Sequence, residues 1–421
     1  MSDSAFLSRN LITTANAWKL AAHERLARRL LHQRLAGLVT GSLRLVDPAS
    51  TTVLGDGPVI EVRIHDPAFY AEVVFAGTVG VGESFARGNW TCADVPGLIA
   101  LFARNRELVD AMDSRWAFIT TPLRHAFHWW HRNTRQGARA NIAAHYDLGN
   151  DFFARWLDPT MSYSACRYAD ATTTLDEAAV AKLDEVCRKL DLKPGMHLVE
   201  IGTGWGGLAI HAARHFGVRV TTTTISEAQR SEAERRIAAA GLSDKITLLG
   251  ADYRDLPRLI GNGVADRLVS IEMIEAIGIR QYPQYFRTLG ALLKGDGLAL
   301  IQAITIPEQR YLPAARSVDF IQRHIFPGSA IPSIGALVEA AGAVRLDLVA
   351  HEDFAQDYAR TLRDWRQRFL ASLPELDRDP RYPRTFQRLW EFYLAYCEGG
   401  FATRAIGVAH LSFAAPAWNR S

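Results

Sequence analysis

A glycine-rich turn in the middle of the chain is the segment best suited to bind a ligand. Glu200-Ile201-Gly202-Thr203-Gly204 ends an apolar stretch over residues 196–201, which predicts a strand, and precedes a helical pattern over residues 208–216. Glycine lets the backbone approach a ligand where any Cβ would collide. The helix start that follows offers free N–H groups to a carboxylate or a phosphate. The segment therefore predicts a nucleotide-type site at the top of a parallel sheet.

The surroundings of this turn decide which nucleotide fits. A dinucleotide fingerprint requires an acidic residue about 20 positions beyond its glycines, at the end of the next strand. The next predicted strand instead ends in Thr-Thr-Thr-Thr-Ile-Ser at residues 221–226, and no Lys-Ser/Thr pair follows the turn as a P-loop requires. An acidic residue before Gly-x-Gly, here Glu200, resembles motif I of the S-adenosylmethionine-dependent methyltransferases. A glycine-rich turn without a ligand is the alternative.

The length of 421 residues predicts two domains. The second, residues 142–421, alternates strand and helix patterns, which predicts a doubly wound, mostly parallel α/β sheet of the Rossmann-like methyltransferase type. Its expected strands are residues 196–201, 218–224, 246–249, 267–271 and 298–304, and its expected helices are 174–190, 207–216, 226–240 and 281–293. Residues 353–404 are helical and aromatic, and we expect them to cover the carboxyl edge of the sheet as a lid.

The first domain, residues 1–120, is predicted to be a smaller α+β unit associated with lipid. Residues 43–46, 59–64 and 69–75 have β character, and the glycine-rich residues 77–85 predict a flexible turn that leads to Trp90. The four cysteines are widely scattered and have no zinc-ligand spacing, so no metal is expected. With no apolar run of membrane-spanning length, we expect a reduced, cytoplasmic protein.

The net charge is only +3, but two segments concentrate basic residues. In residues 18–35, Arg25, Arg28, Arg29 and Arg34 alternate with leucines at helical spacing. Residues 123–139, within a predicted linker at 121–141, combine His and Arg with Trp129 and Trp130. Such segments suit the headgroup boundary of a bilayer, which predicts peripheral association with the inner face of the membrane. No nucleic-acid reader motif accompanies them, so no nucleic-acid partner is expected. A solvated helix face and a plain linker are the alternative.

Several ordered motifs together resemble the cyclopropane-fatty-acyl-phospholipid synthase family, which includes the mycolic acid methyltransferases. The resemblance spans about residues 140–405, and Gly-Glu-Ser-Phe near Glu83 is similar to the amino-terminal domain of the longer members. The matching segments are residues 145–153 (HYDLGNDFF), 157–164 (LDPTMSYS), 200–207, 224–229 (TISEAQ), 252–255 (DYRD), 273–275 (MIE), 325–328 (IFPG) and 357–358.

The resemblance implies S-adenosylmethionine as the cofactor and assigns residues to each of its parts. Gly202 and Gly204 would pass under the methionyl part, beside the motif acid Glu200. The hydroxyls of Tyr163 and Ser164 would bind the cofactor carboxylate. Thr224 and Gln229 would bind the ribose, and Tyr253 and Arg254 would border the adenine.

The family's chemistry constrains the acceptor side of the site. An isolated alkene is a weak nucleophile, so the sulfonium methyl must be held in line with the double bond in a dry pocket. Methyl transfer leaves a carbocation on the acyl chain, which aromatic faces and a carboxylate can stabilise. A base must then remove a proton. The resemblance implies that this base is a bound bicarbonate, which would be a second small ligand besides the cofactor.

Carried over by position, the family's anion site corresponds to Glu275, the backbone of Ile304, and Tyr358. Two positions depart from the family pattern. The family cysteine is Ala165 here, with a cysteine displaced to Cys166, and the family histidine before the isoleucine is Gln302. The histidine that commonly follows the glutamate is Ala276. Gln302 can donate to an anion but carries no charge, so the bicarbonate site is weakened.

These features predict a methyltransferase that acts on the double bond of an unsaturated acyl chain in a membrane phospholipid and forms a cyclopropane ring. The departures leave another product open: a methylene- or methyl-branched chain, or a furan-precursor fatty acid. A non-catalytic lipid-binding scaffold is the alternative from a different class. The acyl chain, the headgroup and the oligomeric state stay open, with a homodimer as one option.

Overall fold

A computed structural model describes residue 18 and residues 20–107 and 148–419, which group into two compact units. The first unit comprises the chain up to residue 118 together with Asp379–Phe392. The second comprises Ile119–Arg378 and Tyr393–Ser421. In the part of the chain that the structure describes, no helix is both long and apolar enough to cross a membrane. The basic segment at residues 123–139 lies outside the described residues.

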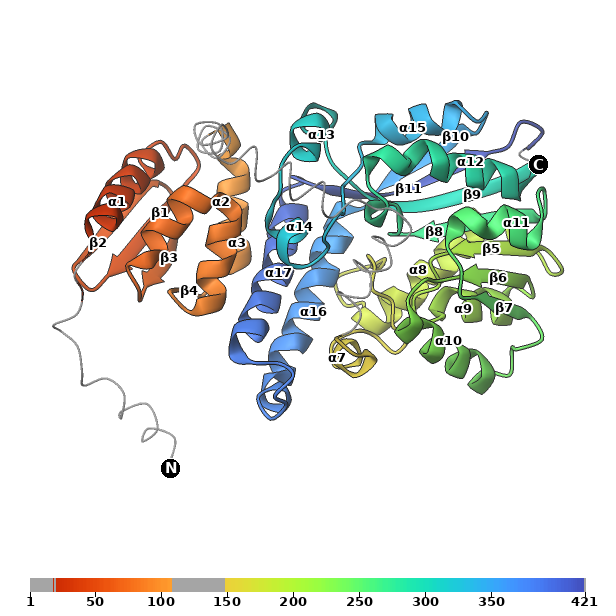
Figure 1. Ribbon diagram of the computed structural model, residues 1–421, viewed down its shortest axis with the longest axis horizontal. Coiled ribbons are helices and arrows are strands. Elements are labelled where there is room, and N and C mark those ends of the chain that lie inside the picture. The colour runs from red at the N-terminus through yellow and green to blue at the C-terminus, as the bar shows by residue number, and fades with distance from the viewer. Residues whose placement is uncertain (1–17, 19, 108–147, 420–421) are drawn as a thin grey trace. The chain divides into compact units, whose positions relative to one another are not determined.

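The first unit contains a four-stranded sheet in the order β2-β1-β3-β4 (Figure 1). Strand β1 pairs antiparallel with β2 and parallel with β3, and β3 pairs antiparallel with β4. Its elements are α1 (Ala22–Leu35), β1 (Gly41–Asp47), β2 (Ser50–Asp56), β3 (Val59–Ile64), α2 (Ala68–Arg87), β4 (Trp90–Cys92) and α3 (Val95–Arg104).

Helix α2 corrects the prediction for residues 69–85. The strand expected at residues 69–75 and the flexible turn expected at 77–85 are both helical, with a kink at Gly77 (φ +57°). Phe69, Tyr70, Val73 and Val74 are all buried. Their i, i+1, i+4, i+5 spacing fits one helix face, so tertiary burial overrides the β propensity of these residue types.

The second unit is built around a seven-stranded sheet in the order β10-β11-β9-β8-β5-β6-β7. The pairs from β9 through β7 are parallel, and β11 runs antiparallel to both of its neighbours. The mostly parallel α/β fold is thus confirmed. The strands are β5 (His197–Ile201), β6 (Arg219–Thr223), β7 (Ile246–Leu249), β8 (Ala265–Ile271), β9 (Leu293–Thr305), β10 (Asp347–Asp353) and β11 (Gly407–Ala414).

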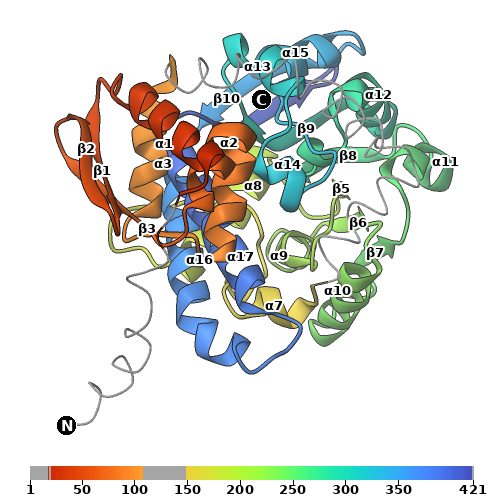
Figure 2. The ribbon, with the colours of Figure 1, turned by 60° about the vertical axis from the view of Figure 1, so that its left-hand side comes forward.

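Helices cover both faces of this sheet (Figures 1 and 2). On one face the strands share a core with α8 (Leu175–Lys189), α9 (Gly207–His215) and α10 (Glu227–Ala239). On the other face the core includes α11 (Leu256–Ile260), α12 (Tyr282–Leu292) and α15 (Ile334–Gly342). The shorter helices are α7 (Asn150–Ala154), α13 (Glu308–Ala315) and α14 (Phe320–His324), with 3₁₀ turns at Tyr253–Asp255, Ile274–Ala276 and Ile279–Gln281.

The strand order reverses at β5, because the chain proceeds to β6 and β7 on one side and returns to β8 and β9 on the other. In open α/β sheets, ligands bind beyond the carboxyl ends of the strands at such a switch point. Helices α16 (Ala355–Leu376) and α17 (Arg384–Ala402) follow β10. The second half of α17 packs on α16, with Tyr358 and Phe401 ring centroids 4.3 Å apart.

Candidate active site

The glycine-rich turn between β5 and α9 has the backbone of a ligand-binding loop. Gly202 (φ +97°) and Gly204 (φ +54°) occupy the left-handed region that favours glycine. A Cβ added to Gly204 would meet no heavy atom within 4 Å, so the turn borders open space. A Cβ added to Gly202 would lie 3.3 Å from Met273 Cγ. The turn therefore lies beside the segment that follows β8.

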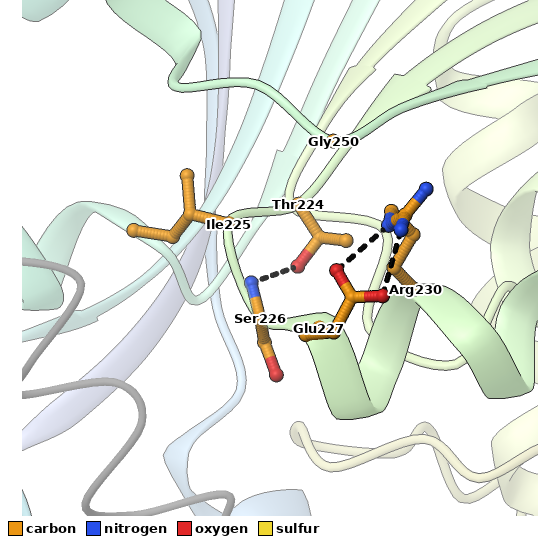
Figure 3. Close-up of a pocket in the computed structure, with 6 residues that line it drawn as sticks. All are labelled: Thr224, Ile225, Ser226, Glu227, Arg230 and Gly250. Atoms are coloured by element: carbon orange, nitrogen blue, oxygen red, sulfur yellow. Dashed lines mark hydrogen bonds and ion pairs between the residues drawn. The ribbon is translucent and has the colours of Figure 1, made fainter.

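The expected ribose pair lies at the end of β6 and the start of α10. Thr224 Oγ1 donates to Gln229 Oε1 at 3.1 Å and accepts from the Ser226 N–H at 3.1 Å. Both side chains of the pair are buried, and Ser226 caps α10. The structure therefore brings Thr224 and Gln229 together as the motif predicted. Figure 3 shows the neighbouring pocket, which is lined by Thr224, Ile225, Ser226, Glu227, Arg230 and Gly250.

The expected adenine residues follow β7. The Asp252 carboxylate holds the Arg254 guanidinium through two contacts, from Nε at 2.8 Å and Nη2 at 2.6 Å. Tyr253 is buried, and its hydroxyl has no hydrogen-bond partner within the described ranges. Because an unpaired buried hydroxyl costs free energy, this group is available to a ligand. Open space at Gly204 and this hydroxyl are features that fit an adenosyl cofactor.

Glu200 lies beneath the turn rather than on its open side. Its side chain is buried on β5 and accepts from Thr222 Oγ1 on β6 at 2.5 Å. Burial raises the pKa of Glu200 to about 7. Glu200, the expected motif acid, therefore links strands β5 and β6 below the glycine-rich turn.

Tyr163 and Ser164, expected to bind the cofactor carboxylate, both have partners within the second unit. Tyr163 Oη lies 2.8 Å from Tyr393 Oη, and Ser164 Oγ accepts from Lys182 Nζ at 2.9 Å. Lys182, on α8, is 2% exposed and has no ion pair in the described part of the chain. Because Lys182 occupies a lone pair of Ser164 Oγ, the serine proton is left to donate elsewhere. A carboxylate bound here would accept the proton of the Ser164 hydroxyl and form an ion pair with the Lys182 ammonium.

We therefore expect Lys182→Met to weaken S-adenosylmethionine binding by about 10–100-fold, the usual worth of one hydrogen bond to a charged group. Affinity for 5′-methylthioadenosine, which lacks the methionyl carboxylate, should change by less than about twofold. Calorimetry with both ligands makes the comparison, and thermal unfolding checks the fold. An equal loss for both ligands would contradict the assignment.

Glu272, which sequence reasoning missed, is the centre of the acceptor side. Its carboxylate accepts from Tyr358 Oη at 2.6 Å, from Gln302 Nε2 at 2.7 Å and from the Ala165 N–H at 2.9 Å. Glu272 follows β8 with φ +46°, in the left-handed region that favours glycine. Three of the expected anion-site positions therefore meet at a carboxylate of the chain itself.

Glu275 lies three residues further on, in the 3₁₀ turn after β8. Its Oε1 accepts from the Ile304 N–H at 2.6 Å, while Oε2 is buried without a hydrogen-bond partner among the described residues. Burial, and then the neighbouring Glu272, raise the pKa of Glu275 to about 8. Glu275 and the Ile304 backbone, both expected to hold a small anion, therefore bind each other, and a pKa of about 8 leaves the carboxyl mostly protonated at neutral pH.

Cys166 does not join this group, contrary to the expectation that it borders the anion. Its side chain is fully buried, and its Sγ donates to the Ser164 carbonyl oxygen at 3.8 Å. Burial raises the pKa of this thiol. The displacement of the cysteine by one position turns its side chain away, and the backbone N–H of Ala165 faces Glu272 instead.

A histidine that the sequence did not single out orients Gln302. His410, its register partner on β11, lies with Nε2 2.9 Å from Gln302 Oε1 and Nδ1 2.8 Å from Lys189 Nζ. An ammonium only donates, so Nδ1 accepts and Nε2 carries the proton. Burial holds the pKa of His410 well below its usual value, so the ring is neutral. Gln302 Oε1 therefore faces His410, and its NH₂ group faces Glu272.

Aromatic side chains pack against Tyr358, a partner of Glu272, whose ring centroid lies 6.1 Å from that of Trp365. Tyr163 has Phe153, Trp156 and Trp365 ring centroids 5.4–5.5 Å away. Tyr358 from α16 reaches Glu272 directly. The expected contact between the aromatic tail and the carboxyl edge of the sheet is therefore present, and the walls offer π faces that can stabilise a cation.

The basic face predicted on the first unit is only partly exposed. Arg28 of α1 is 24% exposed and pairs with buried Asp47 at 3.1 Å, so it is not free for a headgroup. Arg25 and Arg29 are exposed. Leu31 and Leu35 pack in the core of the unit, while Leu26 is 54% exposed.

Known proteins with similar sequences and structures include lipid-modifying methyltransferases. Residues 133–411 match a family model described as Mycolic acid cyclopropane synthetase. The tuberculostearic acid methyltransferase UfaA1 of Mycobacterium tuberculosis is 36% identical over 92% of this chain and 90% of its own length. The cyclopropane-fatty-acyl-phospholipid synthase of Escherichia coli K12 is 34% identical over 88% of this chain and 91% of its own length. Mycolic acid cyclopropane synthase CmaA1, solved with SAH and CTAB, has a TM-score of 0.60, 31% identity, and coverage of 66% of this chain and 98% of its own.

Proposed function

Because the chain belongs to the mycolic acid cyclopropane synthetase family and is an S-adenosylmethionine-dependent methyltransferase, we propose that it methylates the double bond of an unsaturated acyl chain carried by a membrane phospholipid. The observation that carries the proposal is the carboxylate of Glu272, fixed by three hydrogen bonds beside the cofactor turn and close to aromatic walls. This arrangement suits a carbocation, which needs negative charge, π faces and the absence of water.

The cofactor supplies an electrophilic sulfonium methyl when it is bound. Gly202 and Gly204 would lie under its methionyl part. Ser164 and Lys182 would bind its carboxylate, and Thr224 and Gln229 would bind its ribose. Tyr163 was expected at the cofactor carboxylate, but its hydroxyl contacts Tyr393. Its ring and that of Trp365 would border the alkene and stabilise the positive charge that appears on the acyl chain. Glu272 and Glu275 would then face the carbon from which a proton must leave.

Ring closure is the product we propose, in line with the activity for which the Escherichia coli relative is named. A methylene-branched chain is the second candidate, favoured by the departures at Ala165, Ala276 and Gln302. From the same cation, a hydride shift before proton loss gives the branched alkene instead of the ring. The two products are isomers, so mass alone does not separate them, whereas hydrogenation under mild conditions adds two hydrogens to the methylene product only.

Labelled cofactor and phosphatidylglycerol vesicles with oleoyl chains test the function. We expect label in the fatty acids of these vesicles and none in matched vesicles with saturated chains. Label in a soluble small molecule, with no transfer to the oleoyl lipid, would contradict the proposal.

Peripheral attachment to anionic lipid is part of the same proposal. Each basic residue near the surface contributes about 1 kcal/mol, and salt weakens it. Co-sedimentation should therefore rise with anionic lipid and fall with salt. Vesicle binding that does not change with anionic lipid or with salt would contradict the peripheral attachment, but it would not contradict the proposed methyl transfer.

A further inference from the structure

We propose that Glu272 replaces an exogenous anion in this chain and is the base that takes the proton from the methylated acyl cation. The inference rests on the proposed function and deepens it. The groups expected to hold a small anion were Glu275, the Ile304 backbone, Tyr358, Gln302 and Cys166, with Ala165 at the position of the family cysteine. Of these positions, the Tyr358 and Gln302 side chains and the Ala165 backbone N–H contact one carboxylate that is covalently part of the chain.

The hydrogen bonds place the negative charge of the acid pair on Glu272. Glu272 accepts three hydrogen bonds, whereas Glu275 accepts one, from Ile304, on Oε1. Hydrogen bonds to the charged form favour ionisation. Two carboxyls so close do not both ionise readily. Burial raises the pKa of Glu272 as well, but its hydrogen bonds to Tyr358, Ala165 and Gln302 counteract this rise, so Glu272 is the member of the pair that ionises first and Glu275 the member that keeps its proton.

The surroundings keep the donors aimed at Glu272. Lys189 donates to His410, His410 donates to Gln302, and Gln302 donates to Glu272. Each partner fixes the direction of the next, so the Gln302 amide cannot turn its oxygen toward the carboxylate without losing its hydrogen bonds to His410, Glu272 and the Ala165 carbonyl oxygen. An amide held in this way is a permanent donor, as an anion site requires.

The backbone at residue 272 is informative as well. A non-glycine residue in the left-handed region costs of order 1–3 kcal/mol, and such strain concentrates at functional sites. Glycine would relieve the strain at φ +46°. The backbone conformation therefore tolerates a Glu272→Gly substitution. In this variant the donors of Tyr358, Gln302 and Ala165 would face a space the size of the removed carboxylate.

The proposed step balances in atoms and charge. Methyl transfer to one alkene carbon leaves the cation on the other. Glu272 takes one proton from the added methyl group, and the C–H electron pair forms the bond that closes the ring. Cation and carboxylate become a neutral ring and a neutral carboxylic acid, and the proton returns to water after the product leaves.

The test compares the wild type, Glu272→Gln and Glu272→Gly on oleoyl phosphatidylglycerol vesicles in CO₂-free buffer, with and without bicarbonate. The wild-type rate should be the same in both buffers. Both variants should lose about 10²–10³ in turnover, the usual effect of removing one well-placed electrostatic group. Bicarbonate should restore Glu272→Gly by at least about tenfold. It should not restore Glu272→Gln, whose amide still fills the space.

Cofactor affinity and thermal unfolding of each variant separate a chemical from a structural role, because loss of the base alone leaves both near wild type. A wild type that needs bicarbonate, or a Glu272→Gln variant with near-normal turnover, would overturn the inference. An unstable Glu272→Gly leaves the decision to the isosteric Gln variant. Failure of the wild type to label oleoyl lipid in any buffer would instead overturn the proposed function.

Discussion

Gly204→Val should lower the affinity for S-adenosylmethionine by about 100-fold or more, because it puts a branched side chain into the space where the cofactor would lie. Gly204 has φ +54°, and an added Cβ there meets no protein atom within 4 Å. Valine would thus be strained by the backbone, but it would not collide with the fold. Calorimetry with the cofactor measures the loss.

Gly263 provides a matched control for the strain. Its φ is +61°, and an added Cβ there also meets nothing within 4 Å, but the residue precedes β8 at the opposite end of the strand from Glu272. Gly263→Val should lose a similar amount of stability and keep its cofactor affinity. Equal affinities for the two variants would show that the turn at Gly204 is not the cofactor site.

Glu275→Gln should stabilise the fold at alkaline pH. The Glu275 carboxyl has a pKa of about 8 in the folded chain against an ordinary value of 4.5. Between these values the folded chain holds a proton that the unfolded chain has lost, so the wild type loses stability as pH rises through this window. Glutamine does not ionise. The variant should match the wild type near pH 5 and exceed it by about 2–4 kcal/mol at pH 9.

Denaturant unfolding at pH 5, 7 and 9 measures this difference for Glu275→Gln. Every other titrating group is shared with the wild type, so the change in the difference with pH reports on residue 275 and its coupling to Glu272. A difference that stays constant over the whole range would contradict the raised pKa. It would also remove the argument that Glu275 is the protonated member of the pair.

The motifs proposed for the cofactor side of the site could be recognised in the sequence because each is local. Gly202 and Gly204 lie in one turn, and Thr224 and Gln229 are five residues apart across one helix start. The family and the S-adenosylmethionine cofactor that these motifs predicted are confirmed. The parallel core of the sheet was also predicted, since each strand is a short apolar run between helices.

The acceptor side could not be predicted in the same way, because it forms only through long-range contacts. Glu272 follows an apolar strand and carries no local signal, and its partners come from β9 and α16 and from the segment before α8. His410 becomes relevant only through its register with Gln302. Strand β11 joins the sheet from the far end of the chain, and helical periodicity at residues 69–75 was hidden by β-branched and aromatic residue types.

The left-handed backbone at residue 272 also has a genetic consequence. Glycine is the residue that fits this conformation without strain, and two of its codons, GGA and GGG, differ from the glutamate codons GAA and GAG by a single base. On our proposal, a single base change at codon 272 therefore adds or removes the carboxylate that the chain supplies itself. Dependence on dissolved carbonate could then be lost or regained in lineages without any rebuilding of the fold.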